Sequence, residues 1–587
     1  TSDCMIISAQ NVTLDCNGYY ISSTQNYSGV YSNQYNTTVK NCNVSMGTDG
    51  NSNAIGIEMT NAADYSSVMN NTIIGEMDYG ISFAPGDDGP ENSLIENNTV
   101  DVSAVNSTGG AIATTGIYLR DANNNTLRNN NATSLSEYGI YLYSSYSNIT
   151  NNFGTSVSGH GMIYLGSYAN VFNNSGTSIS GYGLYIGYGG SNNILNGNTG
   201  TSNSGYGIYY YAPVNNMVYN TIGRSNSSSG FFDQGGTINN TFINLTGTSN
   251  SSSGIYLGTY NGNNTLINST GISNFNVGIS IAGSFNTVDN SIGVTGGNGG
   301  GVCGFTFSYG SHDHLLTRIT AIGNGSSSDA LGCFNTAGNI TIKDCINISG
   351  TNRDVYFYTG INSNITFINC SYRTSGTNES VTAGSQLIRK WYYRAYVNDT
   401  AGSAVSGANV SAFNSSSSQE FSILTNSSGW TNITTITEYV NNGGTRTYYN
   451  NYTINISVTG YYNGNRSENI TILTNQLGDI FTLSENVFPL ISFISPTQSN
   501  NTYLNASSTE INVSISELNL NEVKYNWNGT NFTLYNDSLV LMMNFDNLSA
   551  LGENSTLVVD VSKYCYDNET QVQTAERWKY FKDLNYD

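Results

Sequence analysis

The stretch Gly-Ile-Tyr-Leu at 116–119 returns as Gly-Ile-Tyr-Leu-Tyr at 139–143, within a longer series of glycines that are each followed by an apolar residue. The glycines of the series are Gly116, Gly139, Gly161, Gly183, Gly207, Gly230, Gly254 and Gly278. The steps between them are 23, 22, 22, 24, 23, 24 and 24 residues. A nearly fixed period is typical of repeat architectures, so we expect a stack of similar units.

Each repeat contains three short segments with strand character. The alternation in the first segment places Ile117 and Leu119 on one face and Tyr118 on the other. A polar turn leads to a second segment, such as Asn-Ile-Thr-Asn at 148–151, and the third segment reads Gly-Thr-Ser, as at 154–156. Strands this short bury no core alone, whereas coils stacked about 4.8 Å apart bury a continuous apolar column. The Gly, Asn, Ser and Thr between the segments are poor helix formers, which argues against helical leucine-rich repeats.

The period therefore predicts an all-β fold, a right-handed parallel β-helix solenoid followed by Ig-like β-sandwich domains. We expect the β-helix over 1–386, with about fifteen coils. The first Ig-like sandwich is expected over 387–485. A second one is expected over 486–587, together with a C-terminal extension.

Three segments resemble known families. Asn-Val-Thr-Leu-Asp-Cys-Asn-Gly at 11–18 and Asn-Ile-Thr-Phe-Ile-Asn-Cys-Ser at 364–371 resemble the β-helix repeats of pectin-lyase-like and NosD-type proteins. The abundance of Asn and of glycosylation sequons is similar to that of large secreted proteins of archaeal cell surfaces. Gly-Ser-Ala-Val-Ser-Gly-Ala-Asn-Val at 402–410 resembles the carboxypeptidase-regulatory-like class of Ig-like sandwiches. These resemblances imply a fold rather than a function, because such β-helices include lyases, hydrolases, adhesins and scaffolds.

The segment Ser-Leu-Val-Leu-Met-Met-Asn-Phe-Asp at 538–546 leaves three interpretations open. It resembles the opening strand of a laminin-G or lectin-like jelly roll, which would be an incomplete module here. It would otherwise belong to the second sandwich. The third interpretation is an exposed strand that is donated to a neighbouring subunit.

The composition excludes several classes of protein. The chain has 587 residues and a net charge of −21, and only 10% of its residues are charged, against about 25% in an average domain. With 18 Lys and Arg in all, a basic nucleic-acid-binding protein is excluded. The 38% of hydrophobic residues exclude a highly charged disordered chain. The sequence contains no apolar run long enough to span a membrane.

Eight cysteines, none of them in a CxxC motif, are interpreted through the repeat. Cysteines about one period apart would lie at the same position of adjacent coils, where a Cα separation near 4.8 Å allows a disulfide. Free buried thiols are the alternative. The pairs expected to form disulfides are Cys16–Cys42, Cys345–Cys370 and Cys303–Cys333. Cys4 and Cys565 remain, and a bond between them would join two molecules.

A glycosidase-like histidine motif is interpreted as structural. Gly-His-Gly at 159–161 resembles a motif of polygalacturonase-type hydrolases on the same fold. That chemistry needs two carboxylates flanking the scissile bond, and the adjacent coils carry none at matching positions. His160 instead occupies the repeat position that is held elsewhere by Tyr138, Tyr182 and Tyr206. We therefore expect no enzyme activity; a polysaccharide lyase or glycoside hydrolase is the last of the alternatives.

Two further histidines are candidates for a metal site. His312 and His314 are two residues apart, so they would face one side of a strand and could hold a metal ion. The segment aligns with the polar turn of other coils, and a solvated turn is the simpler interpretation. No cofactor is expected apart from covalent N-glycans, and a structural calcium ion is allowed.

Asn-X-Ser/Thr sequons recur along the chain and are acceptors of N-glycans on exported proteins. A chain this rich in Asn, Ser and Thr also produces many of them by chance. Together with the low charge, they favour an extracellular location at the cell surface. The candidate glycosylation sites are Asn36, Asn43, Asn106, Asn148, Asn226, Asn244, Asn268, Asn347, Asn364, Asn398, Asn432, Asn469, Asn512 and Asn528.

Two features that recur from coil to coil remain. Asn pairs at 129–130, 151–152 and 173–174 would form amide ladders inside a turn. An outward stripe of tyrosines would either stack on itself or offer an aromatic platform to sugar or to another subunit. The tyrosines of this stripe are Tyr118, Tyr141, Tyr185, Tyr209 and Tyr256.

These features predict a structural cell-surface glycoprotein, a subunit of an extracellular filament, sheath or S-layer. We expect it to form a homo-oligomer or homopolymer through its termini and its Ig-like domains. The alternative is an adhesin that binds carbohydrate through the tyrosine stripe or the sandwiches.

Overall fold

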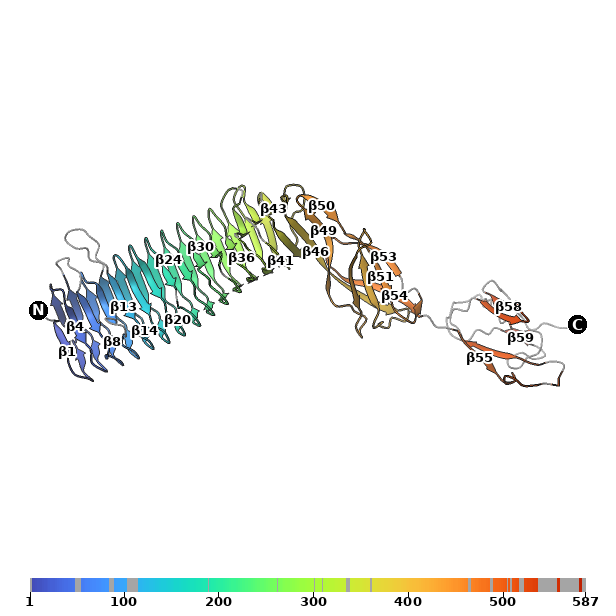
Figure 1. The fold of residues 1–587 in the computed structure, drawn as a ribbon, viewed down its shortest axis with the longest axis horizontal. Coiled ribbons are helices and arrows are strands. Elements are labelled where there is room, and N and C mark those ends of the chain that lie inside the picture. Colours follow the sequence, from blue (N-terminus) through green and yellow to red (C-terminus); the bar gives the residue numbers. More distant parts are fainter. Residues whose placement is uncertain are drawn as a thin grey trace.

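The computed structural model is all-β, and it consists of a long β-solenoid of about fifteen turns followed by smaller antiparallel sheets (Figure 1). The predicted β-helix is therefore confirmed as the main body of the chain. The structure describes residues 3–47, 54–83, 89–102, 114–187, 189–260, 262–299, 301–308, 310–333, 338–358, 362–462, 466–485, 489–503, 505–506, 509–516, 522–536, 557–559 and 580–582.

Three parallel sheets run along the solenoid. Each coil as far as β42 gives one strand to each sheet, and the described coils after it give strands to sheets A and B. Sheet A begins most repeats and carries the Gly-Ile-Tyr pattern. Its strands are β1 (Met5–Ile7), β4 (Ser28–Ser32), β7 (Ile55–Met59), β10 (Tyr79–Phe83), β13 (Thr115–Arg120), β16 (Tyr138–Tyr143), β19 (His160–Tyr164), β22 (Leu184–Ile186), β25 (Ile208–Tyr211), β28 (Phe231–Gln234), β31 (Ile255–Leu257), β34 (Ile279–Ile281), β37 (Cys303–Phe307), β40 (Asp329–Cys333), β43 (Arg353–Phe357) and β45 (Glu379–Ser380).

Sheet B follows the first polar turn of each coil. Its parallel strands are β2 (Thr13–Asp15), β5 (Thr38–Lys40), β8 (Ser67–Met69), β11 (Leu94–Glu96), β14 (Thr126–Arg128), β17 (Asn148–Thr150), β20 (Asn170–Phe172), β23 (Ile194–Asn196), β26 (Met217–Tyr219), β29 (Thr241–Ile243), β32 (Thr265–Ile267), β35 (Thr287–Asp289), β38 (Leu315–Thr317), β41 (Ile340–Lys343), β44 (Asn364–Ile368) and β46 (Gln386–Asp399).

Sheet C completes each coil. Its strands are β3 (Tyr20–Ser23), β6 (Asn43–Met46), β9 (Thr72–Ile74), β12 (Thr99–Val102), β15 (Asn131–Ser134), β18 (Phe153–Ser156), β21 (Ser175–Ser178), β24 (Thr199–Ser202), β27 (Ile222–Ser225), β30 (Thr246–Ser249), β33 (Thr270–Ser273), β36 (Ile292–Thr295), β39 (Thr320–Gly323) and β42 (Asn347–Gly350). Residues 103–113, between β12 and β13, lie outside the described residues.

The recurring glycines mark the line along which sheets A and C approach most closely. A Cβ atom added to Gly183, just before β22, would lie 2.2 Å from the backbone nitrogen of Thr201 in β24. A Cβ atom on Gly200 in β24 would lie 2.2 Å from the carbonyl oxygen of Gly207. Real Cβ atoms do not approach backbone atoms this closely, so only glycine fits on both sides of this glycine seam. The seam gives one physical reason for both the Gly-Ile-Tyr and the Gly-Thr-Ser motifs.

Between sheets B and C, one inward position per coil forms a column of buried amides. The Nδ2 of each Asn donates a hydrogen bond to the Oδ1 of the Asn on the next coil, at 2.9–3.1 Å. The predicted ladder is therefore confirmed, and it satisfies polar groups that burial would otherwise leave unpaired. The members of this amide column are Asn71, Asn98, Asn130, Asn152, Asn174 and Asn198.

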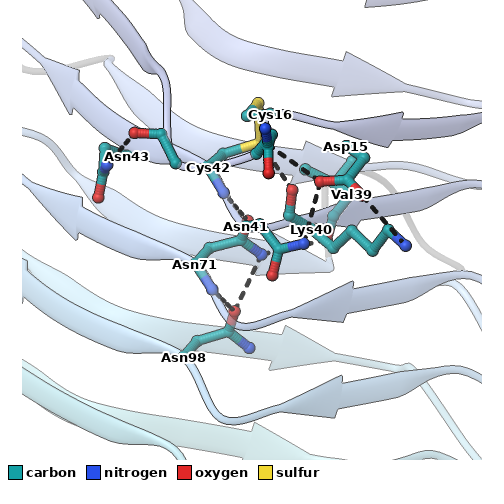
Figure 2. The surroundings of a disulfide bond; sticks show 11 residues. Asp15, Cys16, Val39, Lys40, Asn41, Cys42, Asn43, Asn71 and Asn98 are labelled. Atoms are coloured by element: carbon teal, nitrogen blue, oxygen red, sulfur yellow. Dashed lines mark hydrogen bonds and ion pairs between the residues drawn. A yellow bond between two sulfur atoms is a disulfide. The ribbon is translucent and has the colours of Figure 1, made fainter.

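The first disulfide occupies the same column. Cys16 and Cys42 are bonded, with Cα atoms 4.7 Å apart, and the backbone N–H of Cys42 donates to the Oδ1 of Asn71 at 3.0 Å. Figure 2 shows Asn71 on the coil next to Cys42 and Asn98 on the coil after that. The predicted Cys16–Cys42 bond is confirmed, and it replaces an amide rung by a covalent one.

The second disulfide stands at the corresponding position far along the solenoid. Strands β41 and β44 pair Lys343 with Ile368, and Cys345 and Cys370 follow them by two residues each. Their Cα atoms are 4.8 Å apart, and the predicted bond is confirmed. The two disulfides thus hold coils near opposite ends of one inner column.

The predicted Cys303–Cys333 bond is wrong. Strands β37 and β40 pair Cys303 with Asp329 and Phe307 with Cys333, so the two cysteines are four residues out of register. At about 3.3 Å per residue, this offset is far beyond disulfide reach. Cys303 is a free, fully buried thiol, and burial raises its pKa.

A single long strand joins the solenoid to the sheets that follow it. The first residues of β46 extend sheet B by pairing in parallel with β44, and they also pair antiparallel with β49 (Thr434–Asn442). The last residues of β46 pair with β54 (Gln476–Glu485). The neighbouring short strands are β50 (Thr445–Tyr448), next to β49, and β52 (Tyr461–Tyr462), next to β54.

A second sheet packs against this one around its own core. Its four antiparallel strands, in spatial order, are β48 (Gln419–Leu424), β47 (Asn409–Phe413), β51 (Asn451–Ser457) and β53 (Arg466–Thr471). Buried side chains from both sheets meet, among them Tyr393 of β46, Val410 of β47 and Ile454 of β51.

A buried carboxylate links the last coil to these sheets. Glu379 of β45 has a fully buried side chain that pairs with Arg446 of β50 at 3.0 Å. It also accepts hydrogen bonds from Asn441 at 2.7 Å, from Tyr372 at 2.9 Å and from Tyr439. This cluster satisfies a charge in the interior, where an unpaired carboxylate would be strongly unfavourable.

The C-terminal part consists of two-stranded antiparallel pairs in the described residues. These are β55 (Leu490–Ile494) with β56 (Asn512–Ser516), β57 (Glu522–Trp527) with β58 (Thr530–Asn536), and β59 (Leu557–Val559) with β60 (Tyr580–Lys582). The segment 538–546 and Cys565 lie outside the described residues. In the part of the chain that the structure describes, no helix is long and apolar enough to cross a bilayer.

Candidate functional site

The outer face of sheet A carries the predicted tyrosine stripe. Its five tyrosines are half-buried and point outward, between inward-facing core residues such as Ile117 and Leu119. The strand register places Tyr118 opposite Tyr141, Tyr185 opposite Tyr209, and Phe232 opposite Tyr256. The first row of the stripe is Tyr118, Tyr141, Tyr185, Tyr209, Phe232 and Tyr256, and Ile163 stands between Tyr141 and Tyr185.

A second row of rings runs beside the first at the start of the sheet A strands. The sequence predicts most of this row as one repeat position but does not connect it with the tyrosine stripe. The missed members of the combined surface are Tyr79 and Phe232, because their segments lack the Gly-Ile-Tyr motif. The second row is Tyr79, Tyr138, His160, Tyr182 and Tyr206. We call the two rows together the aromatic stripe.

The rings of the aromatic stripe stack on one another along the solenoid axis. The rings of His160 and Tyr182 are 4.4 Å apart and nearly parallel, at 4°. Those of Tyr206 and Phe232 are 4.1 Å apart, also at 4°. The ring of Phe232 lies 4.8 Å from that of Tyr256, at 11°. Such contacts occupy ring faces, so the stacked rings expose mainly their edges.

This geometry favours self-stacking over a flat platform. A sugar stacks on the open face of an aromatic ring, whereas here the faces are largely covered by the next coil. The stripe therefore stabilises sheet A through cross-strand pairs. Its exposed edges form a ridge of phenol groups, and burial and the neighbouring phenols raise the pKa of Tyr141 to about 12.

His160 is a structural member of the stripe. Its Nδ1 accepts a hydrogen bond from the backbone N–H of Tyr182 at 2.9 Å, which requires a neutral ring with the proton on Nε2. Burial lowers its pKa to about 4. With Tyr138 and Tyr182 stacked on either side, at 5.8 and 4.4 Å between ring centroids, the ring faces are closed to a substrate.

The two candidate metal ligands, His312 and His314, point to different surroundings, one partly exposed and one buried. His314 is buried, and its Nδ1 accepts the backbone N–H of Asn286 at 3.1 Å, as an Asn does elsewhere in a second inner ladder. His312 is half-exposed, and its ring nitrogens form hydrogen bonds with the side chains of Ser284 and Asp313. The expectation of a solvated turn is thus wrong for His314, and burial lowers its pKa to about 4. Among the described residues, no cluster of three or more His, Cys, Asp or Glu side chains offers a metal site.

The candidate glycosylation sites differ in exposure. Nine of those that the structure describes are exposed and three are half-buried, while Asn106 and the side chain of Asn469 lie outside the described part. The half-buried ones are Asn43, Asn398 and Asn512. The exposed ones are Asn36, Asn148, Asn226, Asn244, Asn268, Asn347, Asn364, Asn432 and Asn528.

Comparisons with known proteins bear on the fold. Residues 91–244 match the family model described as right handed beta helix region. No curated protein matches the chain. A double mutant of the tailspike protein of E. coli bacteriophage HK620 is 11% identical, over 71% of this chain and 85% of that chain, with a TM-score of 0.26.

Two further solved structures are similar to this chain at lower TM-scores. The Siphovirus 9NA tailspike receptor binding domain is 11% identical, over 80% of this chain and 87% of that chain, with a TM-score of 0.17. The TIE protein of Bacillus anthracis is 15% identical, over 17% of this chain and 18% of that chain, with a TM-score of 0.13. Likeness at this level carries no argument about function.

Proposed function

We propose that this chain is a structural subunit of an extracellular assembly, such as a surface filament, sheath or S-layer. The observation that carries the proposal is the continuity of β46 from the last coils into the following sheets. Backbone hydrogen bonds on both sides of one strand, with the buried Glu379–Arg446 pair beside it, make the junction stiff. A long, stiff body of this kind suits a load-bearing role.

The proposal includes the identity and location of the modules. The sheets that share the core around Tyr393 correspond to an Ig-like sandwich over 387–485, with a second one over 486–587. The disulfides Cys16–Cys42 and Cys345–Cys370 favour an oxidising compartment outside the cytoplasm. Copies of the chain would associate through their ends and their sandwiches into a homopolymer.

Imaging of the full-length protein by electron cryo-microscopy tests this proposal. We expect ordered filaments or lattices, with contacts through the ends of the solenoid and the sandwiches, at concentrations where control secreted proteins stay dispersed. Monomers that remain dispersed at every concentration, and that bind or cleave polysaccharides, would overturn it.

A glycan-binding adhesin is the second candidate, because the edges of the aromatic stripe remain partly exposed. Binding of oligosaccharides to the chain, followed by titration, would test it. Loss of binding in Tyr185→Ala, and retention in Tyr448→Ala outside the stripe, would support the adhesin.

A further inference from the structure

Six sequons of the solenoid fall into two groups, three in turns and three on strands. Two of the turn sites have a left-handed Asn, with φ of 54° at Asn36 and 56° at Asn244. The next residue, Thr37 or Leu245, is fully buried in an inner column, and the Thr after it begins a strand. Asn adopts the left-handed region more readily than other side chains with a Cβ. At these two sites the fold alone accounts for Asn-X-Thr.

The Asn side chains in the turns also hydrogen-bond to each other from coil to coil. The Nδ2 of Asn36 donates to the Oδ1 of Asn11 at 2.9 Å, and the Nδ2 of Asn244 donates to the Oδ1 of Asn220 at 2.9 Å. In another turn, the Nδ2 of Asn226 donates to Asn203 at 3.2 Å. Neighbouring amides stand one coil apart, about 4.8 Å. A sugar on Nδ2 would have to stand within this row of amides.

The second group lies on strands and has a free amide nitrogen. Asn148 in β17, Asn347 in β42 and Asn364 in β44 are exposed, and each is followed by a buried Ile. Asn148 accepts the Nδ2 of Asn170 at 3.0 Å through its Oδ1. The Nδ2 atoms of all three donate no hydrogen bond to any residue that the structure describes. Asn347 also stands on β42, the last strand of sheet C among the described residues.

We infer that Asn148, Asn347 and Asn364 carry N-glycans, and that Asn36, Asn226 and Asn244 do not. This inference rests on the proposed extracellular role. In the reaction, Nδ2 forms a bond to the anomeric carbon of a sugar, and the bond from that carbon to the phosphate of a lipid-linked sugar donor breaks. The leaving phosphate keeps the bonding electrons, and the proton that Nδ2 loses passes to a base of the transferase. On the strands this modification displaces no amide contact, whereas in the turns it disturbs a stacked row.

The test is secretion of the full chain from a host with an N-glycosylation pathway, followed by glycopeptide mass spectrometry. We expect most copies to carry a glycan at the three strand sites and only a small minority to carry one at the three turn sites. Two matched variants remove the hydroxyl of a sequon and leave its Asn in place. Thr150→Val should remove the glycan on Asn148, and Thr246→Val should leave the glycan mass of the chain unchanged.

Occupancy at the turn sites equal to that at the strand sites would overturn the inference. A secreted chain without any glycan would also overturn it. That second result leaves the structural role to be judged separately, because the imaging of filaments or lattices does not depend on glycans. Conversely, glycans at the strand sites on a chain that never assembles would support the inference and sink the structural role.

Discussion

Replacing one glycine of the seam by alanine tests whether the seam sets the distance between sheets A and C. In Gly183→Ala the new Cβ would lie 2.2 Å from the nitrogen of Thr201, 2.6 Å from the carbonyl oxygen of Gly207 and 2.7 Å from the carbonyl carbon of Gly200. All three are backbone atoms. Thr201 and Gly200 lie in sheet C and Gly207 lies in the next coil of sheet A, so relief requires β22 to move away from sheet C and from the next coil. The second movement would lengthen the backbone hydrogen bond from Leu184 to Gly207, now 3.0 Å.

The expected magnitude follows from two opposing terms. Overpacking of a well-filled interior costs about 1–3 kcal/mol and sometimes more. Alanine in place of glycine restricts the unfolded chain and returns about 0.4–1 kcal/mol. Because the new Cβ meets three backbone atoms, the cost of overpacking should exceed the gain from restricting the unfolded chain. We expect the free energy of unfolding to fall by at least about 1 kcal/mol.

Gly262→Ala is the matched control within the same solenoid. The nearest atom to a Cβ at Gly262 would be the backbone oxygen of Ser284 at 3.4 Å, which is an ordinary van der Waals contact. We expect that variant to be neutral or slightly stabilised. Solenoids unfold in segments, so hydrogen exchange of individual coils is the suitable assay. Faster exchange around β22 and β24 in Gly183→Ala alone is the expected result, and equal protection in both variants would refute the steric account of the seam.

Three further outcomes are expected. Cys42→Ser should release the first coils, with a loss of about 3 kcal/mol and faster hydrogen exchange in β2 and β5; unchanged exchange would argue against a role for the bond. Because the pKa of His160 falls to about 4 when the chain folds, the unfolded state binds more protons below pH 6.5. Stability should therefore fall from pH 6.5 towards 4, and His160→Tyr should flatten this slope in denaturant titrations. Glu379→Ala should leave the Arg446 charge without its carboxylate, cost about 3–5 kcal/mol, and open the junction to limited proteolysis; resistance equal to wild type would contradict the proposed stiffness.

The features that follow directly from a period of 22–24 residues could be predicted from sequence. Ile117 and Leu119 are inward and Tyr118 is outward because alternation within a strand does not depend on the rest of the fold. Cys16–Cys42 and Cys345–Cys370 were predictable because their separations match one uninterrupted coil.

The third pair was wrong because its separation exceeds the coil length. Cys303 and Cys333 are 30 residues apart, whereas the register pairs Cys303 with Asp329, 26 residues on, which leaves the two cysteines four positions out of register. His314 fails for another reason. A polar residue in a turn suggests exposure, but in this fold one position of the turn points inward and requires a hydrogen-bonding side chain. Only the inner ladder, seen across several coils, reveals that a buried His replaces Asn there.

The abundance of Asn has a structural cause, and this cause weakens the argument from the number of sequons to an extracellular location. Left-handed turn positions, as at Asn36 and Asn244, and inward ladder positions, as at Asn152, both favour Asn for reasons of backbone and hydrogen bonding. When a Thr then opens the next strand, a sequon arises whether or not a sugar is attached. The number of sequons therefore says little about location. The two disulfides say more, because stable cystines are expected in oxidising compartments, and the proposed place outside the cell rests chiefly on them.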